Sequence, residues 1–124
     1  DIALEEFFHE VQVNSGIDIQ FRKNEPTFTL TSEAELSIFR GVQEAITNAM
    51  RHGQATRITV LLMYNPSQLV VTIKDNGTGA VDLAPKGGLK SLQERLRAEG
   101  GSVTLEASNP GVTVQMILPN TEKQ

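Results

Sequence analysis

The stretch VTIKDNGTGA, residues 71–80, decides how the rest of this chain is interpreted. It begins as a strand and ends in DNGTG, residues 75–79, which holds two glycines and no apolar side chain. Taken alone, this composition predicts a surface turn, because Asn-Gly is a strong hairpin signal and glycine tolerates positive φ. A functional role for Asp75 therefore needs support from elsewhere in the chain.

The composition is that of one globular domain of 124 residues, long enough to fold without disulfides or metals. Cysteine is absent, which excludes thiolate zinc sites and cysteine nucleophiles and fits a reducing compartment. A net charge of −4 and a pI near 5.1 argue against nucleic acid as a partner. The chain has no initiator Met, so we expect a fragment of a longer protein, with a domain at 1–119 and a loose C-terminal tail at 120–124.

Hydrophobic periodicity predicts the elements in the order helix, strand, helix, two strands, helix, two strands. The helices are expected at 3–14, at 31–52 after a Thr31 or Ser32 cap, and from Leu89 to the glycines at 100–101. A further short strand is expected around Phe28 and Leu30. The stripe of the middle helix that should pack on the sheet consists of Leu36, Phe39, Val42, Ile46, Ala49 and Met50.

Amphipathic helices of this kind bury their apolar faces on a sheet. The order of elements therefore predicts an α/β two-layer sandwich, with three helices packed on one face of a mixed, mainly antiparallel five-stranded sheet.

Two further polar patterns accompany DNGTG. Glu44, Asn48 and Arg51 or His52 recur at spacings of three and four on one face of the middle helix, which is commonly a solvated face, although Asn is a poor helix former. The sequence KGGLKSL, residues 86–92, places glycines before a helix whose free N–H groups can bind an anion, or it forms a loop without a ligand.

Together, the motifs EAITNAMRH, DNGTG, GLKSLQER and ILP resemble the ATP-binding domain of sensor histidine kinases. This domain has the Bergerat fold, which is shared with gyrase, heat-shock protein 90 and the mismatch-repair ATPases. The resemblance extends from the first helix to Pro119 and is closest to the subgroup with E-A-x-x-N-x-x-[KR]-H, D-[ND]-G-x-G and G-L-x-x-[ML]-x-E-R.

The resemblance implies specific roles. Asp75 would accept a hydrogen bond from the adenine amino group, and Gly77 and Gly79 would let the backbone pass close to the base. Asn48 would be the Mg²⁺ ligand, and Glu44 would position or deprotonate a metal-bound water or the nucleophile. The residues expected near the phosphates or ribose are Arg51, His52, Lys86, Gly87, Gly88 and Leu89.

Two positions depart from the family pattern. Lys86 replaces the first glycine of G-x-G-L. Val112 follows Gly111 where the family usually has Thr, and Thr113, one place later, should point to the opposite face of the sheet.

The implied function is to bind Mg-ATP and donate its γ-phosphate to a histidine on a separate dimerisation domain, for relay to a response regulator. The chain itself would be monomeric, cytoplasmic and nearly inactive without that acceptor, and its parent could be an inner-membrane sensor. His9 lacks the R-x-x-H-[DE] neighbours of the family's acceptor. Two alternatives stay open: an anti-sigma-type serine kinase with the same fold, and a non-catalytic interaction module with a vestigial nucleotide pocket.

Overall fold

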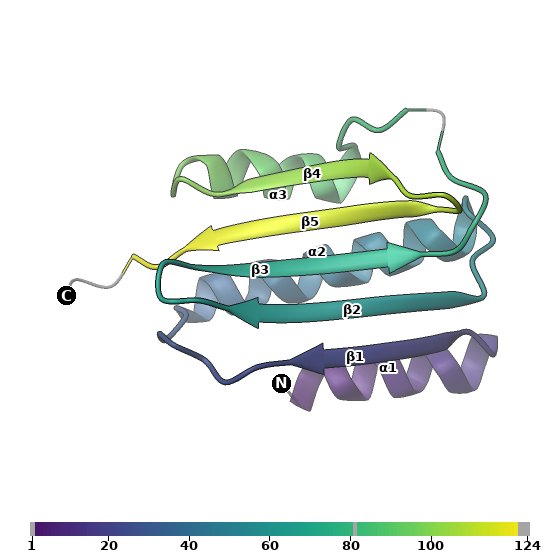
Figure 1. The fold of residues 1–124 in the computed structure, drawn as a ribbon, viewed down its shortest axis with the longest axis horizontal. Coiled ribbons are helices and arrows are strands. Elements are labelled where there is room, and N and C mark those ends of the chain that lie inside the picture. The colour runs from purple at the N-terminus through teal and green to yellow at the C-terminus, as the bar shows by residue number, and fades with distance from the viewer. Residues whose placement is uncertain (1, 81, 122–124) are drawn as a thin grey trace.

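A computed structural model describes residues 2–80 and 82–121 of the chain (Figure 1). Three helices cover one face of a five-stranded sheet, whose strand order is β1-β2-β3-β5-β4. β1 and β2 are parallel, and the other neighbouring pairs are antiparallel. The predicted two-layer sandwich and the predicted order of elements are confirmed. The elements are α1 (Ile2–Ser15), β1 (Asp18–Lys23), α2 (Ser32–Arg51), β2 (Arg57–Tyr64), β3 (Gln68–Asp75), α3 (Gly87–Arg97), β4 (Ser102–Ala107) and β5 (Val112–Pro119).

The prediction of a short strand around Phe28 and Leu30 is wrong, because residues 24–31 form an irregular connection. Strand pairing stops at Asn24, whose side chain accepts from the Tyr64 amide (2.7 Å) and donates to the Tyr64 carbonyl (2.8 Å). These bonds occupy the backbone groups that a longer β1 would pair with. Phe28 is buried instead by its edge-on contact with the Tyr64 ring, with centroids 5.2 Å apart. The apolar residues of this segment therefore reflect burial and do not mark a strand.

Thr31 caps α2, because its hydroxyl oxygen accepts from the Ala34 amide (3.1 Å). Val42 and Ile46 are fully buried against the sheet, as the periodicity predicts. Leu36 was wrongly placed on that stripe, since 46% of it is exposed and Ile38 lies in the core in its place. The face of α2 that packs on the sheet is thus rotated slightly about the helix axis from the predicted face, which included Leu36.

The prediction of a loose tail is wrong at Asn120. Its amide donates to the carbonyl of Ser67 (2.8 Å), and its side chain donates to the carbonyl of Pro66 (3.2 Å). These bonds anchor the chain beyond β5 to the β2–β3 turn. Residues 122–124 of the expected tail lie outside the described part of the chain.

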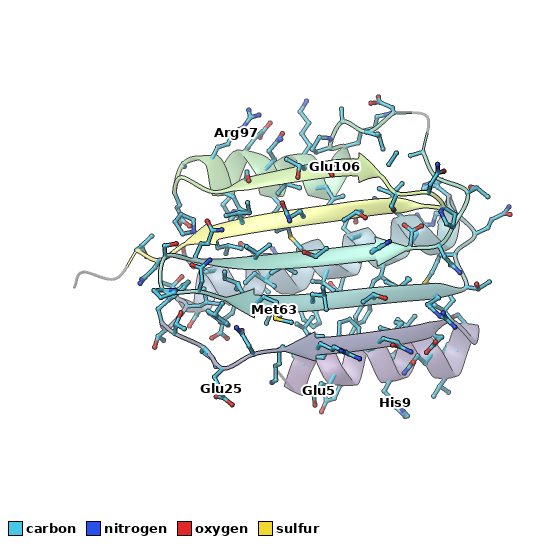
Figure 2. The ribbon with its side chains drawn as sticks, viewed as in Figure 1. Glu5, His9, Glu25, Met63, Arg97 and Glu106 are labelled. Atoms are coloured by element: carbon cyan, nitrogen blue, oxygen red, sulfur yellow. The ribbon has the colours of Figure 1, made fainter. Side chains whose placement is uncertain are left out.

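The two faces of the sheet differ in character. Side chains on the helix-covered face form the core, whereas the other face is open and carries Met63, which is 36% exposed (Figure 2). Along β3 the core side chains are Leu69, Val71 and Ile73, and Asp75 is next in this alternation. The same alternation that builds the core therefore directs the Asp75 carboxylate to the helix side. Among the described residues, no helix is long and apolar enough to cross a membrane.

Ile46→Ala tests the packing of α2 on the sheet. Ile46 has no exposed surface, so the substitution is expected to lower the free energy of unfolding by about 2–5 kcal/mol. Urea denaturation measures this loss. Val13→Ala is the matched control on α1, because Val13 is 68% exposed and its truncation should change the stability by less than about 0.5 kcal/mol. Equal effects of the two substitutions would contradict this packing.

Candidate functional site

Asp75 is a buried carboxylate with one oxygen fixed by backbone. It is 9% exposed, and its Oδ1 accepts from the amides of Gly77 (2.8 Å) and Val112 (3.3 Å). Among the described residues, none donates a hydrogen bond to Oδ2. The two amides orient the carboxylate while its second oxygen stays available as an acceptor for a ligand.

The DNGTG turn packs directly on the end of α2. The amide of Thr78 donates to the carbonyl of Gly53 (2.6 Å), and a Cβ added at Gly77 would collide with that same carbonyl. Gly77 is therefore needed for a close approach of two backbones. This contact brings the exposed Arg51 and His52, which directly precede Gly53, to the same end of the sheet as Asp75.

Gly111, the glycine of the family's last motif, lies directly against Asp75, a contact that the sequence does not predict. It has a φ of +91°, and a Cβ there would collide with the carbonyl of Asp75 and would lie 2.6 Å from its Oδ1. Gly79 also has a positive φ, of +88°, but the nearest atom to its Cβ position is 3.8 Å away. The two glycines thus differ: Gly111 is required by both conformation and space, Gly79 by conformation alone.

The side chain of Asn76 stabilises the DNGTG loop, and the sequence did not predict this role. Its Oδ1 accepts from the amides of Thr56 and Arg57, both at 2.9 Å, and its Nδ2 donates to the Thr56 hydroxyl (3.0 Å). The Asn-Gly pair therefore does not form a two-residue hairpin, because the chain continues from β3 towards α3. The asparagine ties the loop to the start of β2.

The polar row of α2 meets the start of α3. Glu44 and Asn48 are half-buried, and the Cβ position of Gly88 lies 3.1 Å from the carboxyl carbon of Glu44. Gly87 has a φ of +54° and its Cβ position lies 3.8 Å from Glu44 Oε1. The structure thus places the Glu44 carboxylate at the N-terminus of α3, with Asn48 one turn further along α2.

Lys86 is the exposed N-cap residue of α3, and its side chain does not cap the helix. Its ammonium lies 3.0 Å from Asp82 Oδ2, and Asp82 Oδ1 accepts from the Ala84 amide (2.9 Å). The hydrogen bond from Ala84 and then Lys86 lower the pKa of the Asp82 carboxyl. A surface ion pair of this kind is weak, so Asp82 does little to fix the position of the Lys86 ammonium.

Leu89 and Val112 pack into the core, whereas Thr113 lies on the open face of the sheet. Leu89, which the family pattern places at the ligand, has a side chain that is 1% exposed and belongs to the core, so only its backbone is open to such a role. Val112 packs against the core, whereas Thr113 pairs with Lys74 and alternates to the open face of the sheet. This agrees with the expectation that Thr113 points away from the site.

The described residues contain no group of three or more His, Cys, Asp or Glu side chains that could hold a metal ion. A magnesium ion at this end would depend on the Asn48 amide oxygen, water and the phosphates of a nucleotide. Mg²⁺ often binds in this way, since it keeps several waters and needs only one or two protein ligands.

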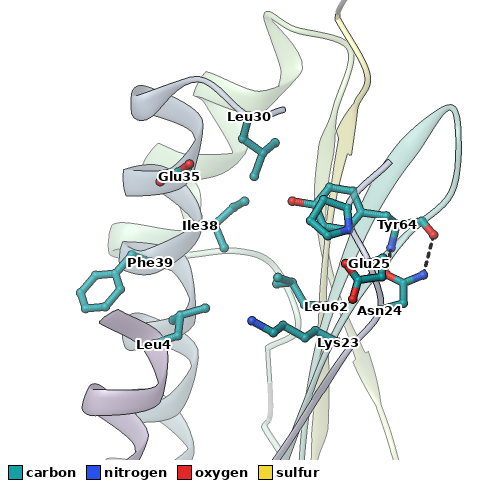
Figure 3. Close-up of a pocket in the computed structure, with 11 residues that line it drawn as sticks. Leu4, Lys23, Asn24, Glu25, Leu30, Glu35, Ile38, Phe39, Leu62 and Tyr64 are labelled. Carbon is teal, nitrogen blue, oxygen red and sulfur yellow. Dashed lines mark hydrogen bonds between the residues drawn. The ribbon is translucent and has the colours of Figure 1, made fainter. Parts of the chain in front are cut away.

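A separate cavity of about 340 Å³ lies beside the first turns of α2 (Figure 3). Leu30, Ile38 and Phe39 line it, and the Tyr64 hydroxyl points into it. Burial, followed by the charge of Glu35, raises the pKa of this hydroxyl. None of the predicted site residues lines this cavity, so it is distinct from the end of the sheet that carries Asp75.

This chain belongs to the family of histidine kinase-, DNA gyrase B- and HSP90-like ATPases, whose sequence model matches residues 33–122. Sensor histidine kinase YxjM of Bacillus subtilis is 32% identical in an alignment of 123 residues, which covers 94% of this chain and 29% of that protein. Oxygen sensor histidine kinase NreB of Staphylococcus carnosus is 29% identical in an alignment of 127 residues, which covers 98% of this chain and 37% of that protein. The chain thus spans about a third of the length of these curated relatives.

Solved structures share the fold. The ATP-binding domain of PrrB from Mycobacterium tuberculosis superposes with a TM-score of 0.72 at 22% identity, covering 93% of this chain and 88% of that one. The catalytic domain of histidine kinase ThkA gives a TM-score of 0.74 at 19% identity, covering 94% and 88%.

Gly111→Ala and Gly79→Ala form a matched pair that tests the geometry at Asp75. Both lose the freedom of positive φ, but only the Gly111 methyl would collide with the Asp75 backbone. We expect Gly79→Ala to cost about 1–2 kcal/mol and Gly111→Ala about 2–5 kcal/mol of stability in urea denaturation. An equal or smaller loss for Gly111→Ala would show that β5 does not approach Asp75 this closely.

Proposed function

We propose that this chain is the ATP-binding part of a sensor histidine kinase. It binds Mg-ATP and donates the γ-phosphate to a histidine on a separate dimerisation domain, which passes it to a response regulator. The observation that carries the proposal is the buried Asp75 carboxylate, with Oδ1 held by two amides and Oδ2 left as an acceptor.

An acceptor held in this way can distinguish adenine from guanine. Adenine presents an amino group, which donates to Asp75 Oδ2, whereas guanine presents O6 at the equivalent position. A carboxylate that only accepts and is 9% exposed would then face another acceptor, and unpaired buried polar groups discriminate strongly. The proposed nucleotide is therefore ATP, with its base at Asp75, Gly77 and Gly79.

The phosphates would extend from the base towards the N-terminus of α3. The free amides at Gly87 and Gly88 and the positive end of the helix favour an anion there, and Lys86 adds a positive charge. Asn48 is the proposed Mg²⁺ ligand. Arg51 and His52 stand at the same end of α2 and are proposed to approach the ribose or the phosphates.

Phosphoryl transfer depends mainly on positioning and charge stabilisation. A nitrogen of the acceptor imidazole forms a bond to the γ-phosphorus, the bond from that phosphorus to the β–γ bridging oxygen breaks, and ADP leaves. Glu44 lies beside Gly88 and is proposed to orient the acceptor or take the proton that its imidazole loses.

The acceptor is proposed to lie outside this chain. His9 is exposed on α1 at the edge of the molecule (Figure 2). His52 is the C-cap of α2, where its amide donates to the Asn48 carbonyl (2.9 Å). The proposed setting for the transfer is the cytoplasm, with a monomeric ATP-binding domain joined to a dimerisation domain.

Asp75→Asn tests the proposed base contact. The amide oxygen can still accept from Gly77 and Val112, so the fold should persist while the charged acceptor is lost. Calorimetric titration with Mg-ATP is expected to show a loss of about 1.5–3 kcal/mol, or about ten- to a hundredfold in affinity. Asp18→Asn is the control, because Asp18 is exposed on β1 and should leave the affinity unchanged. A folded Asp75→Asn variant with the parent affinity would refute the contact.

A further inference from the structure

A groove of about 530 Å³ runs between α2 and α3. The two helices are antiparallel, since Glu44 lies at Gly88 while Ser37, earlier in α2, accepts a hydrogen bond from Arg95, later in α3. One end of the groove therefore opens at Glu44 and Gly88, where the proposed function places the terminal phosphate. The groove continues away from that point along both helices.

Two guanidinium groups line this groove. Arg95 Nη1 donates to the hydroxyl of Ser37 (3.2 Å), and Ser37 is only 3% exposed, so a rigid part of α2 holds the Arg95 side chain in place. Arg40 lines the groove from α2, four residues before Glu44. Within residues 2–80 and 82–121, neither arginine forms an ion pair with a carboxylate. In a chain of net charge −4, this leaves two cations without an acidic partner in one concave surface.

These features favour a helical and acidic occupant. A groove between two helices accepts the ridge of side chains of a third helix. Guanidinium groups bind carboxylates through two parallel hydrogen bonds, and Arg95 keeps donors beyond the one used by Ser37. The remaining lining mixes small and polar residues, among them Ser91 and Thr47, with the apolar side chains of Leu92 and of Phe7 on α1. Such a mixed surface suits an interface that must open after each transfer.

We infer that this groove receives the helix that carries the acceptor histidine, and that carboxylates on this helix pair with Arg40 and Arg95. The inference rests on the proposed function, because that function places the γ-phosphate at the Glu44 end. Pairing with the arginines would hold the histidine at that end, so Arg40 and Arg95 are positioning residues and Glu44 acts on the reacting groups.

The spacing of the arginines predicts where the carboxylates lie. Arg40 is four residues from Glu44 and Arg95 is seven residues from Gly88. At a rise of about 1.5 Å per residue, these separations are about 6 Å and 10 Å. An acceptor helix lying along the groove should therefore carry acidic residues about one and two turns from its histidine, on the same face.

The test uses the full-length kinase with Arg40→Gln, Arg95→Gln and both together. At saturating Mg-ATP, each single variant should lower the rate of histidine phosphorylation about five- to tenfold, and the double variant more. The affinity for ATP should stay within about twofold, because neither arginine lies at the proposed base or phosphate contacts. The parent rate should also fall as salt is raised, and this salt dependence should weaken in the double variant.

Two control variants separate docking from general effects. Arg97→Gln removes a charge from the same helix, but Arg97 lies at the outer edge of the molecule and does not line the groove, so the rate should not change (Figure 2). Ser37→Ala releases Arg95 without removing its charge and should lower the rate less than Arg95→Gln does. Arg40→Lys and Arg95→Lys keep the charge and should restore part of the rate.

Folded Gln variants that phosphorylate the histidine at the parent rate would overturn the docking inference while leaving the proposed function intact. An Arg97→Gln variant that phosphorylates the histidine as slowly as Arg95→Gln would also overturn it. The rate would then depend on the charge of α3 as a whole and not on a cation in the groove. A parent protein that does not bind ATP at all would instead refute the proposed function.

Discussion

The contact between Asp75 and the backbone of two other segments is the constraint on which this end of the molecule depends. One carboxylate oxygen joins the end of β3 to the following turn, through Gly77, and to the start of β5, through Val112. The site is thus fixed by bonds that the fold itself makes, and the carboxylate is oriented before any ligand arrives. Such preorganisation reduces the cost of ordering the site on binding.

The helix α2 connects the two halves of the proposed site. Its buried face, with Val42 and Ile46, is packed on the sheet and has no exposed surface. Its last turn leads to Gly53, which the DNGTG turn contacts, while Glu44, two turns earlier, lies against the start of α3. A single rigid helix therefore sets the distance between the proposed base contact and the proposed phosphate end.

The elements with strong periodicity could be predicted from the sequence. The helices, the five strands and their order follow from apolar spacing and from the glycine and proline breaks, and the buried alternation along β3 extends to Asp75. The short apolar segment with Phe28 and Leu30 was misjudged, because burial on Tyr64 gives the same residue types as a strand. Local pattern cannot separate these two causes.

The parts of the site that escaped prediction are contacts between distant segments. A Cβ at Gly111 would collide with the backbone of Asp75, and a Cβ at Gly77 would collide with the carbonyl of Gly53, and neither approach is visible in the sequence. Asn76 likewise gains its partners from residues 56 and 57, twenty and nineteen positions earlier. The motifs indicated the groups that are proposed to face a ligand, whereas the supporting backbone contacts became visible only in three dimensions.

The measurement that tests the central claim most directly is a pair of calorimetric titrations of this chain with Mg-ATP and with Mg-GTP. A carboxylate fixed by two amides and open at its second oxygen predicts saturable binding of ATP at one site per chain, and binding of GTP at least about a hundredfold weaker. Equal affinity for the two nucleotides would contradict base recognition by Asp75. Absence of binding for both would mean that DNGTG is only a turn.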